Sequence, residues 1–130
     1  MIKIQHKVLA FKHLHKYDGN RWISKVEPVS VTVYKICIDN HVRLICAFKS
    51  KSRWIPMDVL SGITLQGHFT TKATALQELE EFFTDFLDPK YPHIRINRIE
   101  NLNKQEKELY KALDEDQKVC YNNLVDLCVN

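Results

Sequence analysis

The chain has 130 residues, of which 45% are hydrophobic and 27% charged, with only three glycines and four prolines. This composition is that of one ordinary globular domain, and it excludes a disordered, low-complexity or repeat protein. The formal net charge of +3 is unevenly divided: residues 1–72 carry 12 Lys/Arg against 4 Asp/Glu, whereas residues 73–130 carry 7 against 12. We therefore expect a single α+β domain (1–130) with a basic, strand-rich part (1–72) and an acidic, helix-rich part (73–130).

The sequence predicts neither export nor membrane insertion. Lys3, His6 and Lys7 interrupt the first apolar residues, so no signal-peptide core forms, and no apolar run approaches the roughly 18 residues of a membrane span. The cysteines form no C-x-x-C pair and lie in apolar stretches, as reduced core thiols do. We expect a cytoplasmic protein that does not bind membranes.

The first expected strand covers residues 2–17, where the alternation of apolar residues slips in a way that a β-bulge would explain. Asp18-Gly19 follows and predicts a tight hairpin turn, because this dipeptide accepts positive φ angles. The return strand, residues 21–27, stops at Pro28, which has no N–H to give to a ladder. The sequence leaves open whether Pro28 makes a turn or a kink that leads straight into the next strand.

The densest β pattern lies in residues 31–48, where two runs of β-branched and aromatic residues flank Asp39-Asn40. A two-residue loop at this pair places Cys37 opposite Val42 and Lys35 opposite Leu44. Both faces of this ribbon are largely apolar, which indicates a central, covered strand pair and not an edge.

The remaining residues predict mostly helices. A short strand is expected over residues 62–66, and a helix over residues 74–87 with Thr74 and Gln77 as its capping box. Its buried stripe comprises Leu76, Leu79, Phe82, Phe83 and Phe86. Residues 93–99 alternate weakly, as one more strand would. A last helix begins at Asn103, and the sequence leaves open whether it breaks near Asp116, where an aspartate could cap a second piece.

Together these elements predict an α+β fold. We expect a mostly antiparallel sheet built from N-terminal hairpins, with two or three C-terminal helices packed on one face.

No motif indicates catalysis or a bound metal. His13 and His15 share one face of a strand, but no third and fourth ligand lies at metal-site spacing. Phosphate loops, nucleophile elbows and zinc-protease motifs are absent from the sequence. We therefore expect no enzyme, no cofactor and no metal.

Basic and aromatic residues gather in two stretches of the basic part. A two-residue loop at Asp18-Gly19 would bring Lys12 near Lys25 and crowd the cations of the first hairpin together. The candidate partner-binding residues are Lys12, Lys16, Tyr17, Arg21, Trp22 and Lys25 in the first stretch, and Lys49, Lys51, Arg53 and Trp54 in the second. Trp, Tyr and Arg are favoured anchors of protein interfaces, and cations among aromatics also suit phosphate contacts and base stacking. A row of solubilising edge lysines would give the same pattern.

These features predict a small, non-enzymatic binding or regulatory protein that acts by occupying a macromolecular partner. An inhibitor or adaptor of the phage or mobile-element type would fit this description. We expect a protein partner, because a net charge of +3 is small for a dedicated nucleic-acid binder. The alternative is nucleic-acid binding through the basic-aromatic N-terminal sheet, and a homo-oligomer stays open.

Overall fold

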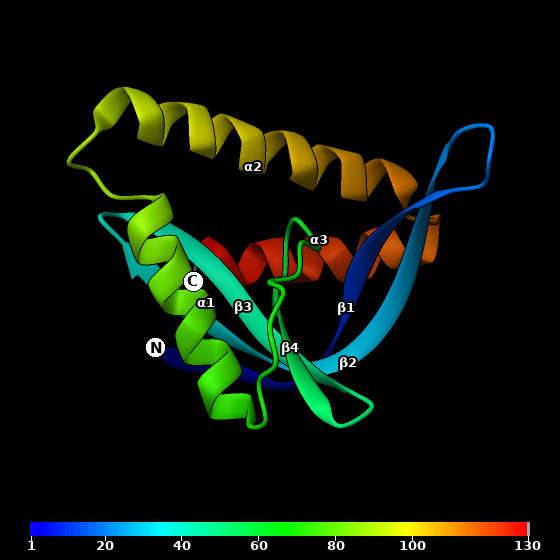
Figure 1. Cartoon of the computed structure of the whole chain (residues 1–130), viewed down its shortest axis with the longest axis horizontal. Helices are drawn as coiled ribbons and strands as arrows, with labels where there is room; N and C mark the ends of the chain where they lie inside the picture. The colour runs from blue at the N-terminus through cyan, green and yellow to red at the C-terminus, as the bar shows by residue number, and fades with distance from the viewer. Residues whose placement is uncertain (130) are drawn as a thin grey trace.

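The structure, a computed structural model, describes residues 1–129, in which a four-stranded antiparallel sheet of order β1-β2-β3-β4 is followed by three helices (Figure 1). The strands are β1 (Ile2–Tyr17), β2 (Trp22–Ile38), β3 (His41–Ser50) and β4 (Arg53–Asp58). The helices are α1 (Lys72–Phe86), α2 (Pro92–Ala112) and α3 (Glu115–Val129). The predicted α+β class, with an N-terminal antiparallel sheet and C-terminal helices packed against it, is confirmed.

The β2–β3 hairpin has the predicted register, with Cys37 opposite Val42 and Lys35 opposite Leu44. Asp39 and Asn40 have φ angles of 47° and 67°, so both lie in the left-handed region that a two-residue hairpin turn requires. Arg95 of α2 donates hydrogen bonds to the carbonyl oxygens of Ile38 and Asp39, at 3.2 and 2.9 Å. The turn is therefore held by a helix as well as by its own residues.

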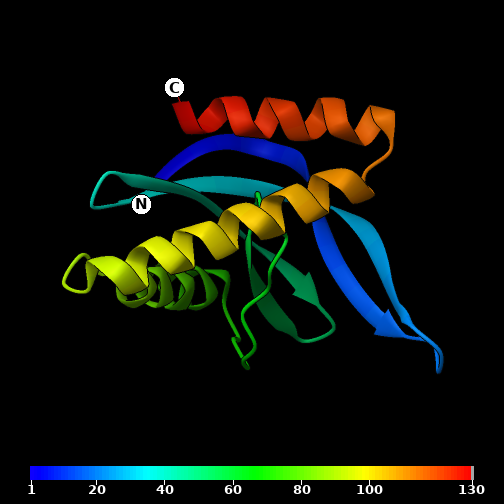
Figure 2. The same cartoon turned by 90° about the horizontal axis from the view of Figure 1, so that it is seen from above.

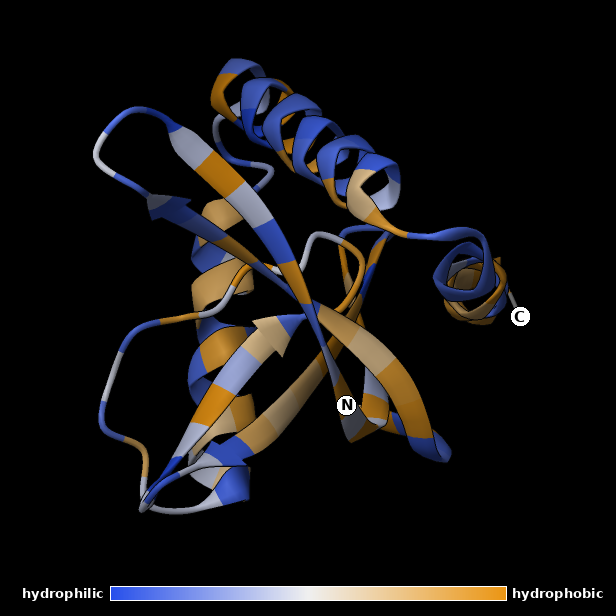
Figure 3. Ribbon diagram, turned by 90° about the vertical axis from the view of Figure 1, so that its right-hand side faces the viewer, coloured by the Kyte–Doolittle hydropathy of each residue, from blue (hydrophilic) through white to orange (hydrophobic). Residues whose placement is uncertain are grey.

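The side chains of β3 alternate between two hydrophobic clusters. Ile45 and Ala47 pack with the buried side chains of α1, whereas Leu44 and Cys46 pack with those of α3. Because successive strand residues point to opposite faces, α1 and α3 cover opposite sides of β3. Figures 2 and 3 show the strands between these two helices. The helices were expected on one face; they divide between two because residues 43–48 of β3 are buried on both sides.

Pro28 lies within β2, opposite Phe11 of β1, so it makes neither a turn nor a strand end. The β2–β3 ladder extends only from Tyr34 to Ile38 on β2. The earlier part of β2 thus has β1 on one side and no ladder on the other, which is where a strand tolerates proline. The result is a long β1–β2 hairpin, whose two strands have 16 and 17 residues.

Residues 62–66 do not form the expected strand. They belong to a loop that makes one isolated bridge, between Met57 and Thr64. Gly62 has a φ of 72°, and a Cβ at this position would lie 2.9 Å from the carbonyl oxygen of Phe11. This close approach requires glycine, and it lets the loop pack against β1.

The helix boundaries also differ from the prediction. Helix α1 begins two residues earlier than expected, and its N-cap is Thr71, whose hydroxyl accepts from the Thr74 N–H at 3.1 Å. The predicted strand over residues 93–99 is wrong, because these residues form the first turns of α2, which starts at Pro92. Proline suits this first helical position, since its missing N–H would have no partner there.

The sequence left open whether the last helix breaks near Asp116; it does break there, between Ala112 and Glu115, and Asp114 caps the second piece. The Asp114 carboxylate accepts from the Gln117 N–H at 2.8 Å, and the Gln117 side chain accepts from the Asp114 N–H at 3.0 Å. These two hydrogen bonds form a reciprocal cap at the start of α3.

Candidate binding surface

The β1–β2 hairpin projects past the helices as an arm, defined here as residues 15–25, in which every residue is exposed (Figures 1 and 2). Tyr17 and Trp22 face each other at its end, with ring centroids 5.5 Å apart. The exposed fractions of these residues are 59% and 70%. The arm therefore presents two neighbouring aromatic rings to solvent.

The turn of the arm is wider than the sequence predicted. Asp18 and Arg21 close a four-residue loop through a 3.1 Å hydrogen bond from the Asp18 N–H to the Arg21 carbonyl. The Asp18 carboxylate accepts from the N–H groups of Arg21 and Asn20, both at 2.9 Å, and these bonds lower its pKa. This carboxylate is thus turned back onto the loop, as aspartate commonly is in turns.

The wider turn changes the neighbours of the predicted cations. Lys16 lies opposite Ile23 and Lys25 lies opposite Leu14. Lys12 and Lys25 are therefore not direct strand partners, although both lie beside the Glu27 carboxylate, as their predicted proximity requires. Lys12 is instead opposite Glu27, and its ammonium group lies 5.1 Å from the centre of the Phe48 ring. Of the six predicted residues of this stretch, Lys12 is thereby partly withdrawn from the surface, and the others lie exposed on the arm.

The second predicted cluster lies at the β3–β4 turn. Lys49, Lys51 and Arg53 are exposed there, and Lys51 supplies a left-handed residue with φ 58°. Trp54 is half-buried and lies opposite Lys49, with its backbone N–H donating to the Phe69 carbonyl at 2.7 Å. Its side chain is consequently less exposed than those of Tyr17 and Trp22. The two clusters meet where Lys12 and Arg53 line a common hollow of about 180 Å³.

The sequence did not single out two further lysines near the second cluster. Lys7 lies in an irregular part of β1 with φ 56°, and Lys72 is the first residue of α1. Both line a hollow that Lys49 and Trp54 also line. The slipped alternation near Val8 could have pointed to Lys7, whereas Lys72 was missed because the helix was expected to start later.

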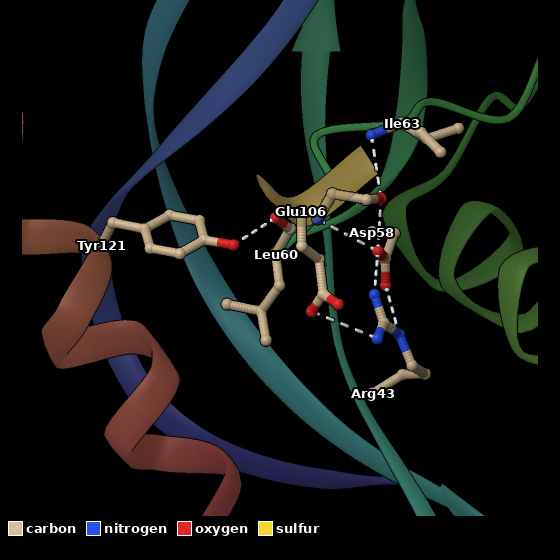
Figure 4. Close-up of polar contacts among 7 residues, drawn as sticks. Arg43, Asp58, Leu60, Ile63, Glu106 and Tyr121 are labelled. Carbon is tan, nitrogen blue, oxygen red and sulfur yellow. Dashed lines mark hydrogen bonds and ion pairs between the residues drawn. The ribbon is translucent and has the colours of Figure 1, made fainter. Parts of the chain in front are cut away.

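A buried network of charges was missed as well (Figure 4). Arg43 of β3, which is 2% exposed, donates from two of its nitrogens to the carboxylate of Asp58, which is 1% exposed. Its third nitrogen lies 3.4 Å from the Glu106 carboxylate of α2. Ser61 also donates to Asp58 from both its backbone N–H and its hydroxyl.

This network ties strands to helices. The Tyr121 hydroxyl of α3 donates to the Leu60 carbonyl at 2.6 Å nearby, which adds the last helix to the same region. Burial raises the pKa of Glu106, and the Arg43 charge only partly opposes that rise. The groups satisfy one another, as buried charges usually must, so we assign the network a structural role.

The rings of His13 and His15 lie with their centroids 4.4 Å apart and their planes inclined by 50°, and His13 also forms a hydrogen bond with Ser24. Across residues 1–129, no group of three or more His, Cys, Asp or Glu side chains is arranged to hold a metal ion. Cys46 is buried, but Cys37 is exposed, which corrects the expectation that every cysteine lies in the core.

None of the helices in the described part of the chain is long and apolar enough to cross a lipid bilayer. Comparison with known proteins found no protein-family model, no curated protein and no solved structure that matches this sequence.

Proposed function

We propose that the protein is a non-enzymatic binding protein that docks its β1–β2 arm onto an acidic surface of a partner protein. It would act by occupying that partner, as an inhibitor or adaptor does. The observation that carries the proposal is the exposed pair of Tyr17 and Trp22 at the end of the arm. The core is complete without this pair, because both buried clusters form from other residues.

The side chains of the arm have the composition of interface anchors. Tryptophan, tyrosine and arginine are the residues that most often dominate protein binding energies, and the arm offers Tyr17, Arg21 and Trp22 together. Rigid aromatic side chains lose little conformational entropy on binding. The pairing of β1 with β2 holds them in position before a partner arrives.

The charge of the arm supports an acidic partner. Lys16, Arg21 and Lys25 are exposed on it, and the one acidic residue between positions 15 and 25, Asp18, directs its carboxylate to backbone N–H groups. A positive patch speeds encounter with a negative one and disfavours other partners.

The test is affinity capture from an extract of the cells in which the gene occurs, with and without nuclease, followed by binding measurements with the purified partner. Trp22→Ala should weaken binding about tenfold or more, as loss of a central aromatic anchor does. Arg21→Gln should weaken it most at low salt, where screening is weakest. Lys104→Gln, which removes an exposed lysine of α2, should leave the affinity unchanged. Retained affinity in Trp22→Ala would refute the proposal.

A nucleic-acid partner is the alternative, and the same aromatic pair supports it. Exposed rings beside cations can stack on unpaired bases while the cations contact phosphates. Nuclease treatment would then abolish capture. The affinity would also fall steeply and linearly on a log–log plot against salt concentration, in proportion to the phosphates neutralised.

A further inference from the structure

We propose that a hollow beside the first turn of α1 binds a phosphate group. The hollow has a volume of about 410 Å³ and lies between the end of the sheet and α1. Its lining comprises Lys7, residues 29–32, Ala47, Phe48, Lys49, Trp54 and Lys72. Three of these side chains are cationic and none is acidic, so the hollow attracts anions. It is separate from the arm, and the proposal does not depend on the proposed function.

The three lysines are not neutralised by the protein itself. Lys7, Lys49 and Lys72 form no ion pair with any residue in positions 1–129. By contrast, Lys12, Arg43 and Arg95 each have a carboxylate partner. Like charges that converge without a counter-ion repel one another, and an oxyanion between them would remove that repulsion.

Helix α1 adds positive potential at the same place. Lys72 is its first residue, and no acidic residue lies in its first turn. The N-terminus of a helix already carries a partial positive charge, so a lysine there is unfavourable unless an anion lies nearby. The Lys72 ammonium group lies 5.4 Å from the centre of the Tyr34 ring, which holds it over the sheet beside the hollow.

Thr32 of β2 adds a hydroxyl group to the lining of the hollow. The residue is only 8% exposed. A phosphate oxygen in the hollow would accept a hydrogen bond from this hydroxyl and complete the set of donors.

Lys7 reaches the hollow because β1 is irregular there. The β1–β2 register shifts between Gln5 and Val8, and Lys7 takes a left-handed φ of 56°. An irregularity of this kind redirects a side chain relative to regular alternation. It places Lys7 beside Ser30 and Thr32 in the lining of the hollow.

Trp54 indicates what the phosphate is attached to. Its half-buried indole lines the hollow together with the lysines, so a flat ring can lie against it while the attached phosphate meets the cations. A nucleotide has this chemistry, either as a free nucleoside monophosphate or as a unit of a single-stranded nucleic acid. The site would bind the phosphate group of either ligand.

The fluorescence of Trp54 provides a direct assay. The chain has two tryptophans, so in a Trp22→Phe variant all tryptophan emission comes from Trp54. Titration with adenosine 5′-monophosphate should give a saturable change with a dissociation constant of about 1 mM or tighter. Inorganic phosphate should compete with it, and adenosine, which lacks the phosphate, should have no effect. The absence of a saturable change with both the nucleotide and an oligonucleotide would overturn the proposal.

Matched variants in the same background locate the binding. Lys49→Gln and Lys72→Gln should each weaken it about tenfold, as expected when a charge-assisted contact is lost. Thr32→Val should also weaken it, whereas Lys104→Gln on α2 and Arg21→Gln on the arm should not. Lys49 is exposed, so its variant tests the site without a risk to folding.

The source of the phosphate follows from a second titration with single-stranded DNA. Binding of the oligonucleotide alone, with the same loss in Lys49→Gln, would support a strand as the ligand. If the Arg21→Gln variant loses oligonucleotide binding and the Lys49→Gln variant keeps it, the oligonucleotide binds to the arm, and the proposed site is overturned.

Discussion

Lys12 of β1 lies directly opposite Glu27 of β2, and its ammonium nitrogen is 3.2 Å from one oxygen of the Glu27 carboxylate. The ammonium nitrogen of Lys25 lies 3.9 Å from the other oxygen of the same carboxylate. Glu27 is therefore shared by two of the cations that the sequence had placed against each other. The negative charge of Glu27 offsets the repulsion between the two lysines within the hairpin.

This arrangement predicts an asymmetric effect on the pKa of Glu27. Lys12 is the main cause of the lowered pKa, through its hydrogen bond and its charge, and Lys25 contributes less. Lys12→Gln should therefore raise the pKa more than Lys25→Gln, as measured by NMR titration of the carboxyl carbon. Because the folded pKa is lowered, the associated stabilisation is present above the ordinary glutamate value and disappears as the pH falls through the folded value. A larger effect of Lys25→Gln would contradict the observed pairing.

The buried Arg43–Asp58 pair predicts a large loss of stability when one partner is removed. Arg43→Met should cost about 3–5 kcal/mol in urea unfolding, because it leaves the Asp58 carboxylate buried without its counter-charge. Asp58→Asn in the same background should restore part of this loss, because the stranded charge is gone.

Arg53→Met is the control, because Arg53 is exposed and its replacement should change stability by less than about 0.5 kcal/mol. Strictly additive losses for Arg43→Met and Asp58→Asn would show that the two residues do not act as a pair.

The parts of the fold that the sequence predicted are those with local causes. Asp39 and Asn40 form their turn because both tolerate positive φ. Asp114 caps α3 by accepting a hydrogen bond from the N–H of Gln117, three positions later. The strand expected over residues 93–99 failed for a different reason. Ile94 and Ile96 suggested alternation, but both are exposed on α2 and neither belongs to a buried face.

The candidate sites depended on contacts that no local pattern encodes. The buried position of Arg43 depends on its contacts with Asp58 and Glu106, which lie 15 and 63 positions away in the chain. The hollow proposed to bind phosphate combines residues of four strands and a helix. The register around Lys12 depends on how the Asp18 carboxylate bonds to its own loop, which the dipeptide Asp18-Gly19 alone does not determine.

Two adjacent phenylalanines of α1 provide a matched test of which helix face is buried. Phe83 is 2% exposed and packs on the sheet, as predicted, whereas Phe82 is 41% exposed despite its place in the predicted stripe. Phe83→Ala should cost about 3–5 kcal/mol, since it leaves a cavity in the core. Phe82→Ala should cost clearly less in the same denaturant series, and equal costs would contradict the orientation of α1.

His41 predicts a loss of stability in mild acid. Burial lowers its pKa, the charges of Arg43 and Arg95 lower it further, and its Nε2 atom is buried without a hydrogen-bond partner among residues 1–129. The unfolded chain then binds a proton more readily than the folded one, so stability should fall as the pH decreases through about 6.5. His41→Phe should reduce this slope in urea unfolding measured from pH 7 to pH 5.

Two further histidines complete the His41 experiment. His13 also has a pKa lowered by burial, so part of the slope should remain in His41→Phe. His93→Phe, at an exposed position of α2, should leave the slope unchanged. An undiminished slope in His41→Phe would show that another group causes the acid sensitivity.

Glu106 predicts the opposite dependence in a lower pH range. Burial is the main cause of its raised pKa; Asp58 raises it further, and Arg43 opposes the rise. Because the folded state holds the proton more tightly, stability should fall as the pH rises from the ordinary glutamate value, about 4.3, through the folded pKa. Glu106→Gln keeps an oxygen that can accept from Arg43 and removes the titration. It should therefore flatten this part of the stability profile and be at least as stable as the wild type at pH 7.

Glu100→Gln, at an exposed position of the same helix, separates the effect of burial from a general effect of charge on α2. It should leave the slope above pH 4.3 in place, because the slope is attributed to the burial of Glu106 and Glu100 is exposed. A marked loss of stability in Glu106→Gln at pH 7 would mean that attraction to Arg43 outweighs the cost of burial. The 3.4 Å contact between the two side chains would then be a net stabilising ion pair.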